Sequence, residues 1–376
     1  MAAPNRSADA SRLTVGEPGL LARLRGQSRP RVRPKAVRNA GRSFAMTFVA
    51  VVALAAFLSP LLRSATMSLK SPEQIADVNS PLYPASAATL TYEGRDYDVY
   101  QVPIAGTTRD LALIKKGRTS SQFADPSDVA APLITWEGAW RTLQPAYKFD
   151  PHPENFSNVW DQIDYPTLLR NTILIALIGT IGTVLSCTLV AYGFARFRFP
   201  GRNVLFLLVI ATIFLPGAVT IIPTYTIFNK IGWVGTWLPL LVPAFFANAY
   251  DVFLLRQYLL TIPREMDEAA SIDGAGPFRT LVSVILPQAW PVVIAVAIFH
   301  LVYSWNDFFQ PLIYLSSTPD LQTVAVGLAR FSGARVASDP GLIQAGTLMT
   351  LAIPVLLFLV FQRFFVRGIV ITAVEK

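Results

Sequence analysis

The sequence has little cysteine and little charge. Cys187 is the only cysteine among 376 residues, which rules out an intrachain disulfide framework. Charged residues make up 15% of the chain and hydrophobic residues 52%. No GxxxxGK[ST] phosphate-binding loop occurs, so any ATP hydrolysis linked to this chain must take place on another chain. Several uncharged runs exceed the ~20 residues that span a bilayer, which predicts a polytopic membrane protein.

The positive charge is concentrated at one end. The formal net charge is +8, and ten Lys and Arg residues lie within residues 1–43, amid Pro, Ser and Gly. We interpret 1–43 as a disordered, basic cytoplasmic tail that can contact anionic lipid headgroups. No aromatic residues or folded module accompany the arginines, so we expect no nucleic-acid partner.

The apolar runs predict six transmembrane helices. The first, at 44–62, is interpreted as an uncleaved signal anchor. The others are expected at 172–195, about 203–223 with a break at Pro216, about 238–258, about 290–315 and about 342–361. Six spans place both termini on one side of the membrane. The positive-inside rule makes that side the cytoplasm, chiefly through the arginine-rich tail.

Residues 63–170 lie between the first two spans and are predicted to form an extracytoplasmic insert. Alternating apolar residues on either side of 93–96 predict a β-hairpin, and 111–114 predict a further strand. A small β-rich domain is expected here. Trp136, Trp140 and Trp160 are interpreted as aromatic contacts to a partner or to the membrane interface.

The loop at 256–288 carries the most specific motif. Acidic residues cluster where a helix would start, two alanines favour the helix, and a glycine then permits a turn. This pattern resembles the cytoplasmic coupling loop of ABC-importer permeases, with its EAA signature. The matching and flanking positions are Glu268, Ala269, Ala270, Asp273, Gly274, Ala275 and Pro287. The resemblance implies that the loop docks into a partner ATPase, which would bind ATP and Mg.

Polar residues within the apolar runs predict a translocation path. His300, Ser304 and Asp307 recur at i, i+4 and i+7 and would share one helical face. A carboxylate inside a membrane costs at least ~2.5 kcal/mol, so Asp307 should face water or a partner. A capping role for Asp307 near the outer interface and an interhelical hydrogen bond for His300 remain open. The other candidates for the path are Tyr303, Trp305, Asn306, Asn248 and Asp251.

A narrower resemblance comes from two further segments. Trp305–Phe309 with Pro311–Ile313, and Gln362–Gly368 at the C-terminal end, resemble carbohydrate-importer permeases of the maltose and glycerol-phosphate kind. The resemblance covers the first span and about 165–376, taken as a permease core from residue 171. It implies an all-α, type I permease fold in a bacterial inner membrane, without catalysis or a cofactor of its own. The implied partners are a second permease, two ATP-binding subunits and an extracytoplasmic solute-binding protein.

Other function classes remain possible from the residues alone. An importer for another solute would share the EAA loop, although not the other two segments as a set. An ion-coupled secondary transporter could use Asp307 and His300. A receptor with 63–170 as its sensor is disfavoured, because no cytoplasmic output domain is found in the sequence. The long insert departs from relatives with a shorter first external loop.

Overall fold

The computed structural model describes residues 35–104, 106–335 and 339–371, so most of the predicted tail lies outside the described residues. The chain divides into two units, Met1–Pro60 and Leu61–Lys376. Helix α1 (Lys35–Met67) contains the first unit's apolar run, and its segment Ser43–Met67 is long and apolar enough to cross a membrane. The predicted first span is therefore a helix that continues to Met67. The helix begins at Lys35, so the prediction of a disordered tail is wrong for residues 35–43, which are helical.

The described residues contain five helical segments with the length and hydropathy of membrane spans, or six if one bent pair counts as a span. The bent pair consists of α5 (Arg202–Ala211) with η2 (Thr212–Phe214), followed by α6 (Gly217–Lys230), and its two arms meet at 99°. Pro216 stands at the break, as predicted, because proline cannot donate the backbone hydrogen bond that would continue the first helix. The remaining segments are Ser43–Met67, Tyr165–Arg196, Leu238–Thr261, Pro277–Asn306 and Pro340–Val360.

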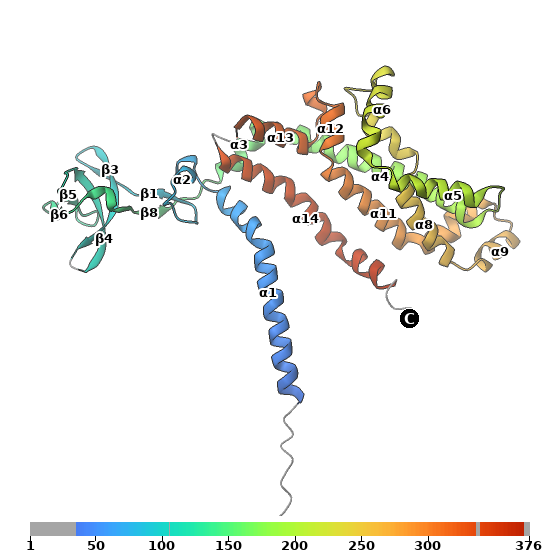
Figure 1. Ribbon diagram of the computed structural model, residues 1–376, viewed down its shortest axis with the longest axis horizontal. Helices are drawn as coiled ribbons and strands as arrows, with labels where there is room; N and C mark the ends of the chain where they lie inside the picture. Colours follow the sequence, from blue (N-terminus) through green and yellow to red (C-terminus); the bar gives the residue numbers. More distant parts are fainter. Residues whose placement is uncertain (1–34, 105, 336–338, 372–376) are drawn as a thin grey trace, which may run out of the picture. The chain divides into compact units, whose positions relative to one another are not determined.

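The largest apolar core in the second unit lies between α4 (Tyr165–Arg196), α8 (Ala249–Thr261) and α11 (Leu286–Asn306), which pack side by side (Figure 1). Small residues of α4, among them Cys187, Ala191 and Ala195, are fully buried against Val252 and Leu255 of α8. Further short helices of the second unit are α7 (Leu238–Leu241), η3 (Val242–Phe245), α9 (Glu265–Ile272), α10 (Pro277–Thr280), η4 (Leu281–Ile285), α12 (Phe309–Tyr314) and η5 (Pro319–Leu321). The longer helices α13 (Val324–Arg335) and α14 (Pro340–Ile371) follow them.

The segment between α1 and α4 contains antiparallel strands. One sheet has the order β2-β3-β4-β5-β6 with β7 beside β3, and β1 pairs separately with β8. The predicted hairpin is confirmed: Glu93 and Gly94 form a two-residue turn in the left-handed region, with φ of 49° and 77°. The strands are β1 (Ala85–Ala87), β2 (Thr89–Tyr92), β3 (Arg95–Ile104), β4 (Thr107–Lys115), β5 (Ser120–Ala124), β6 (Ile134–Glu137), β7 (Gln144–Pro145) and β8 (Tyr147–Phe149).

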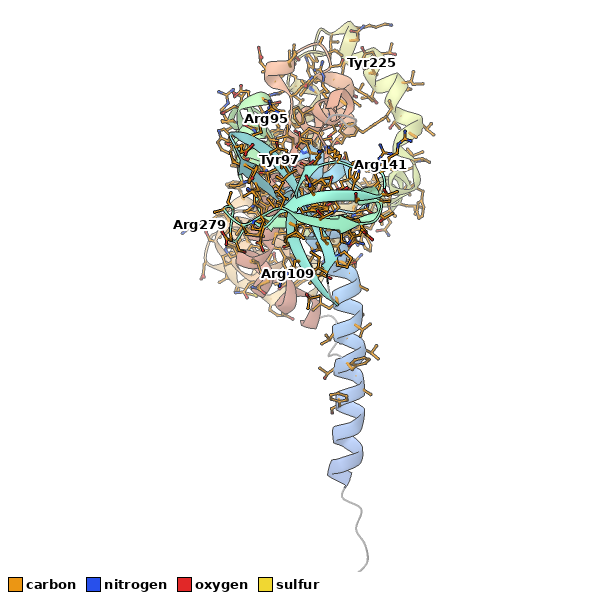
Figure 2. All side chains as sticks on the ribbon, turned by 90° about the vertical axis from the view of Figure 1, so that its left-hand side faces the viewer. Arg95, Tyr97, Arg109, Arg141, Tyr225 and Arg279 are labelled. Carbon is orange, nitrogen blue, oxygen red and sulfur yellow. The ribbon has the colours of Figure 1, made fainter. Side chains whose placement is uncertain are left out.

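Trp136 and Trp140 are not the exposed aromatic anchors that the sequence suggested. Both are half-buried and pack against the core of this sheet, where Trp136 meets the ring of Phe123 edge to face. The indole N–H of Trp136 donates to the carbonyl of Pro103 at 3.2 Å. Figure 2 labels three exposed arginines of this segment, Arg95, Arg109 and Arg141, which lie well apart from one another in that view.

The β-segment is attached to the helices at its base by α2 (Pro72–Ala76) and α3 (Glu154–Gln162). Asn155 of α3 is buried, and its side-chain amide donates to the carbonyls of Ser68 and Lys70 at 2.9 and 3.1 Å. Val159, one turn further on, packs against Leu342 and Ala345 of α14. A displacement of the β-segment would therefore be transmitted to the start of α14.

Candidate functional site

The EAA stretch forms helix α9 with an acidic first turn that contains Glu265, Asp267 and Glu268. Three carboxylates suit this position, since the N-terminus of a helix carries partial positive charge. The helix starts two residues after Pro263, and Met266 points back into the α4–α8–α11 core. One side of α9 is therefore fixed by apolar packing.

The hydrogen bonds at the end of α9 involve three residues of the motif, Ala270, Gly274 and Ala275. The N–H of Ala275 donates to the carbonyl of Ala270 at 2.9 Å, and the N–H of Gly274 donates to that of Ser271 at 3.1 Å. These two bonds define a Schellman motif, which requires a left-handed residue after the helix. Gly274 has φ of +78°, so glycine is needed there for conformational reasons. Ala270 is 6% exposed, so its small side chain permits close packing within this chain.

Arg196, at the C-terminal end of α4, fastens the loop to the membrane core. Its Nε lies 3.3 Å from the Asp267 carboxylate, an ion pair without hydrogen-bond geometry. Its Nη2 donates to the carbonyl of Ile262 at 3.0 Å. One turn earlier, the Tyr192 hydroxyl donates to the carbonyl of Pro277 at 3.2 Å. Both ends of the α9 loop are thus tied to one helix, and sequence analysis missed these residues.

The face of the loop that points away from the core is exposed. Glu268 and Ala269 lie on it, together with Ile272, which is 87% exposed, and Phe278, which is 72% exposed. Large exposed apolar side chains beside a charged helix are typical of an interaction surface. Ile272 and Phe278 were not singled out from sequence, although apolar residues in an otherwise polar loop are a readable signal.

Pro287 was expected in the loop, but it lies inside the helical segment Pro277–Asn306. The fifth span therefore begins earlier than the predicted residue 290. The π-helical turn η4 (Leu281–Ile285) directly precedes Pro287. A widened turn accommodates a proline ring, which cannot donate to the preceding turn of a regular helix. Pro277, at the start of the segment, occupies the first position of α10, which proline favours.

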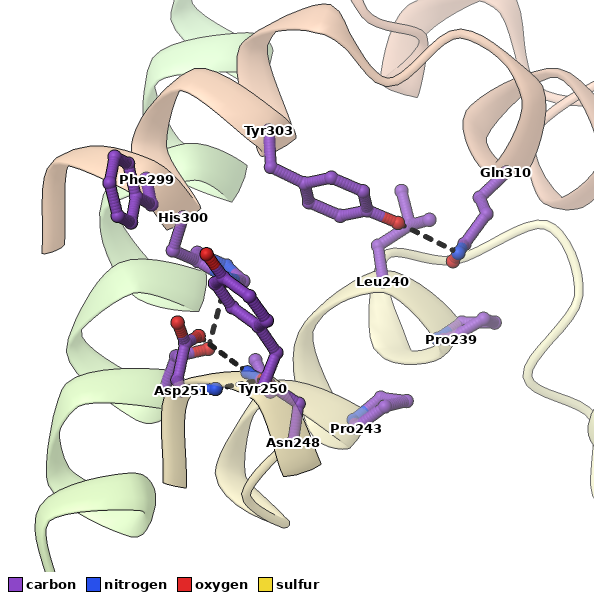
Figure 3. Close-up of a pocket in the computed structure, with 12 residues that line it drawn as sticks. Pro239, Leu240, Pro243, Asn248, Tyr250, Asp251, Phe299, His300, Tyr303 and Gln310 are labelled. Atoms are coloured by element: carbon purple, nitrogen blue, oxygen red, sulfur yellow. Dashed lines mark hydrogen bonds between the residues drawn. The ribbon is translucent and has the colours of Figure 1, made fainter. Parts of the chain in front are cut away.

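A cavity of about 430 Å³ opens beside the α4–α8–α11 core. Figure 3 shows its walls: Asn248, Tyr250 and Asp251 come from the start of α8, and Phe299, His300 and Tyr303 come from α11. The remaining lining residues are Thr183, Pro239, Leu240, Pro243, Ala244 and Gln310. The cavity is therefore built from five stretches of chain, with polar groups on a largely apolar lining.

Hydrogen bonds fix several of these polar groups. Asn248 caps α8, since its Oδ1 accepts from the N–H of Asp251 at 2.9 Å, while its Nδ2 donates to Asp251 Oδ2 at 2.6 Å. His300 Nδ1 and Thr183 Oγ1 are 3.1 Å apart. A Cβ on Gly179 would lie 2.9 Å from His300 Nε2, so a glycine in α4 leaves room for the imidazole.

Only four of the eight residues predicted for the translocation path line the cavity. His300, Tyr303, Asn248 and Asp251 line it. The expected helical face fails at Asp307, because α11 ends at Asn306 and Asp307 has extended backbone angles. Asp307 Oδ1 instead accepts from the N–H of Gln310 at 3.2 Å, the contact expected of the capping alternative.

The other three predicted residues also lie apart from the cavity lining. Trp305 is 5% exposed, and the Asn306 amide donates to the carbonyl of Val302 at 2.8 Å. Ser304 is half-buried and is not part of the lining. Sequence analysis missed Thr183, Tyr250 and Gln310, of which Thr183 gives a signal as a polar residue within an apolar helix. Among the described residues, no group of three or more His, Cys, Asp or Glu could hold a metal ion.

The chain was compared with known families and solved structures. Residues 182–370 match the family described as "Binding-protein-dependent transport system inner membrane component". A crystal structure of a bacterial ABC transporter involved in the import of the acidic polysaccharide alginate contains a similar chain. Its TM-score is 0.60 at 18% identity, covering 87% of this chain and 98% of that chain, which establishes a shared fold.

Curated relatives are similar over the same region. The osmoprotective compounds uptake permease protein GgtD of Synechocystis sp. is 33% identical over 59% of this chain and 74% of its own. The arabinooligosaccharides transport system permease protein AraQ of Halalkalibacterium halodurans is 32% identical over 60% and 82%. The sn-glycerol-3-phosphate transport system permease protein UgpE of Agrobacterium fabrum is 34% identical over 54% and 72%. With its apolar helices and this match over half its length, the chain is a multi-pass inner-membrane protein that belongs to the family of binding-protein-dependent transport system inner membrane components.

Proposed function

We propose that this chain is a permease subunit of an ATP-driven importer for a sugar or an oligosaccharide, with no catalytic activity of its own. A second homologous permease, two ATP-binding subunits that bind ATP and Mg, and an extracytoplasmic solute-binding protein complete the complex. The sugar assignment is supported by relatives such as the arabinooligosaccharide permease. The observation that carries the coupling role is an exposed α9 face on a loop fixed at both ends to α4.

The anchoring of α9 gives a physical reason for its coupling role. A loop can transmit a displacement to a transmembrane helix only if its connection to that helix is rigid. Arg196 and Tyr192 bind opposite ends of the loop to α4, so a displacement of α9 is carried into the packed α4–α8–α11 core. In the proposed mechanism, closure of the ATPases moves α9 and switches the cavity beside that core from inward to outward access.

Reconstituted transport tests this function. The chain is co-expressed with its partner subunits, inserted into liposomes and given labelled sugar with the binding protein. Uptake should require ATP and the binding protein, and vanadate should abolish it. Uptake that survives vanadate and collapses with the ion gradient would instead establish an ion-coupled transporter.

We also propose that the β-segment is extracytoplasmic and is where the solute-binding protein docks, with both termini of the chain in the cytoplasm. Two residues at its base can transmit a displacement: Asn155 binds the carbonyls of Ser68 and Lys70 just after α1, and Val159 packs against α14. Ala87 and Tyr147 are paired neighbours in β1 and β8, and the Tyr147 hydroxyl donates to Asp77 at the end of α2. A short Gly/Ser linker can therefore replace 88–146 and leave β1, β8 and their contact with α2 in place.

The linker variant should keep assembly and basal ATPase activity and should lose stimulation by the binding protein. Replacing the hairpin turn at Glu93 and Gly94 with Asn-Gly, which forms the same turn, is a matched control that should leave stimulation intact. Unchanged stimulation of the linker variant would contradict a docking role.

A further inference from the structure

The cavity lining carries a negative charge without a positive one. Asp251 supplies a carboxylate, and neither Lys nor Arg is among the lining residues. The ion pairs of the described residues do not involve Asp251. The nearest arginine along α8, Arg256, instead lies over the ring of Phe206, 4.0 Å from its centroid. The carboxylate therefore has no cationic partner within the part of the chain that the structure describes.

The geometry of Asp251 leaves one acceptor free. The residue is 5% exposed, and Asn248 holds Oδ2 through its amide at 2.6 Å. Asp251 Oδ1 accepts no hydrogen bond from any described residue. It is also not one of the fully buried unpaired atoms, so it keeps some accessible surface. Because the residue lines the cavity, this oxygen is the acceptor that Asp251 can offer to a solute there. A buried carboxylate without a cation is retained only where something else compensates for its cost.

The rest of the lining favours hydroxyl groups over charges. Tyr250, Tyr303 and Thr183 carry hydroxyls that both donate and accept, and Gln310 adds an amide. Tyr250 and Tyr303 also bring aromatic rings to the lining, and such rings can pack against the C–H groups of a sugar. No described group of this cavity is a permanent cation that would neutralise a carboxylate, phosphate or sulfate on the solute.

We propose that Asp251 is a specificity-determining residue that makes this cavity accept neutral, hydroxyl-rich solutes and reject anionic ones. This inference rests on the proposed import function and narrows its substrate class to neutral saccharides and polyols. It separates this chain from importers of acidic polysaccharides or phosphorylated polyols, even where the fold is shared. Two like charges about 10 Å apart at an effective dielectric constant of about 20 disfavour each other on the order of tenfold.

Charged thiol reagents test the cavity directly, without knowledge of the natural sugar. Tyr303→Cys places a thiol on the part of the cavity lining that α11 provides, whereas Asp251 belongs to α8, and Ser157→Cys on the exposed side of α3 is the control. Cys187 stays in place, because it is fully buried and contacts Asn248. Cationic, neutral hydroxyethyl and anionic methanethiosulfonates are reacted with the assembled complex. Each rate is divided by that with a free thiol in solution, which removes intrinsic differences between reagents.

At Tyr303→Cys the anionic reagent should react about tenfold more slowly than the neutral one, and the cationic reagent at least as fast as the neutral one. Adding Asp251→Asn should bring the three rates together, while the Ser157→Cys rates stay unchanged. Equal rates with Asp251 in place would overturn the proposal, as would a thiol that none of the reagents reaches.

Rejection of the anion that persists in Asp251→Asn would assign selectivity to another group and refute the role of Asp251. If Asp251→Asn does not assemble, the ratio measured with Asp251 present decides alone. The labelling requires neither ATP nor binding protein. ATPase stimulation measured on the same preparation therefore tells failure of this inference apart from failure of the import function.

Discussion

The turn after α9 permits a test in which backbone conformation is the only variable. Gly274 has φ of +78°, and a Cβ built there meets nothing within 4 Å, so substitution strains the backbone without a steric clash. A residue with a side chain costs about 1–2 kcal/mol in the left-handed region, and a β-branched one is among the worst suited. That strain lowers the population of the observed turn by a factor of about 5–30.

Gly274→Val should therefore impair binding-protein-stimulated ATPase activity and uptake by about that factor, with normal membrane insertion. Gly276→Thr is the matched control. Gly276 also has open space around it, but its φ is −70°, and threonine suits its position as the N-cap of α10. Gly274→Asn should give intermediate activity, because asparagine tolerates the left-handed region. Normal uptake by Gly274→Val at normal expression would refute the reasoning.

Three further substitutions probe other contacts. Arg196→Ala removes an ion pair and a charged hydrogen bond, so it should weaken loop attachment by roughly 1.5–3 kcal/mol and reduce stimulated more than basal ATPase activity; equal reductions would contradict this. Asn155→Ala leaves two buried carbonyls without a donor and should destabilise the purified chain by about 1–3 kcal/mol in thermal unfolding, whereas the exposed Asn158→Ala should not. The Tyr147 hydroxyl donates to Asp77; burial and this bond raise the pKa of Tyr147 to about 12, and the bond lowers the pKa of Asp77. The Tyr147–Asp77 hydrogen bond should stop stabilising the fold as Asp77 is protonated below pH 3.8, and as Tyr147 ionises between pH 10 and about 12. Tyr147→Phe should therefore make the free energy of unfolding less dependent on pH in both ranges.

Features set by local sequence were predictable. Uncharged runs marked the helices, Pro216 marked the break, and residues 93–96 marked the hairpin, although Arg95 and Asp96 already belong to β3. The EAA stretch correctly predicted a helix with an acidic start, followed by a turn, because each of these features depends on residues only a few positions apart. The count of six spans stays a prediction that depends on how the bent pair is treated.

Features set by packing were not predictable from one helix at a time. The His300 partner, Thr183, lies 117 residues earlier, and no periodicity within α11 could have indicated it. The end of α11 was missed because mostly apolar residues resume directly after Asn306 and Asp307 and continue to Leu315, although an aspartate such as Asp307 is a common cap. Trp136 and Trp140 were assigned outward because a bulky residue in a short strand, such as Trp136 in β6, or in a short 3₁₀ turn, such as Trp140, can face either side.

The sheet order has a consequence for how the chain folds. In β2 to β6 each strand pairs with the next one in sequence, so these pairings close short loops and can form early. The pairing of β1 with β8 joins Ala85 to Phe149 and must wait until the whole segment has been synthesised. Formation of that last pair brings Ala85 and Phe149 together, and we expect it to precede completion of α4, which comes later in the chain. The β-segment is thus expected to be the first part of the second unit to reach its native structure.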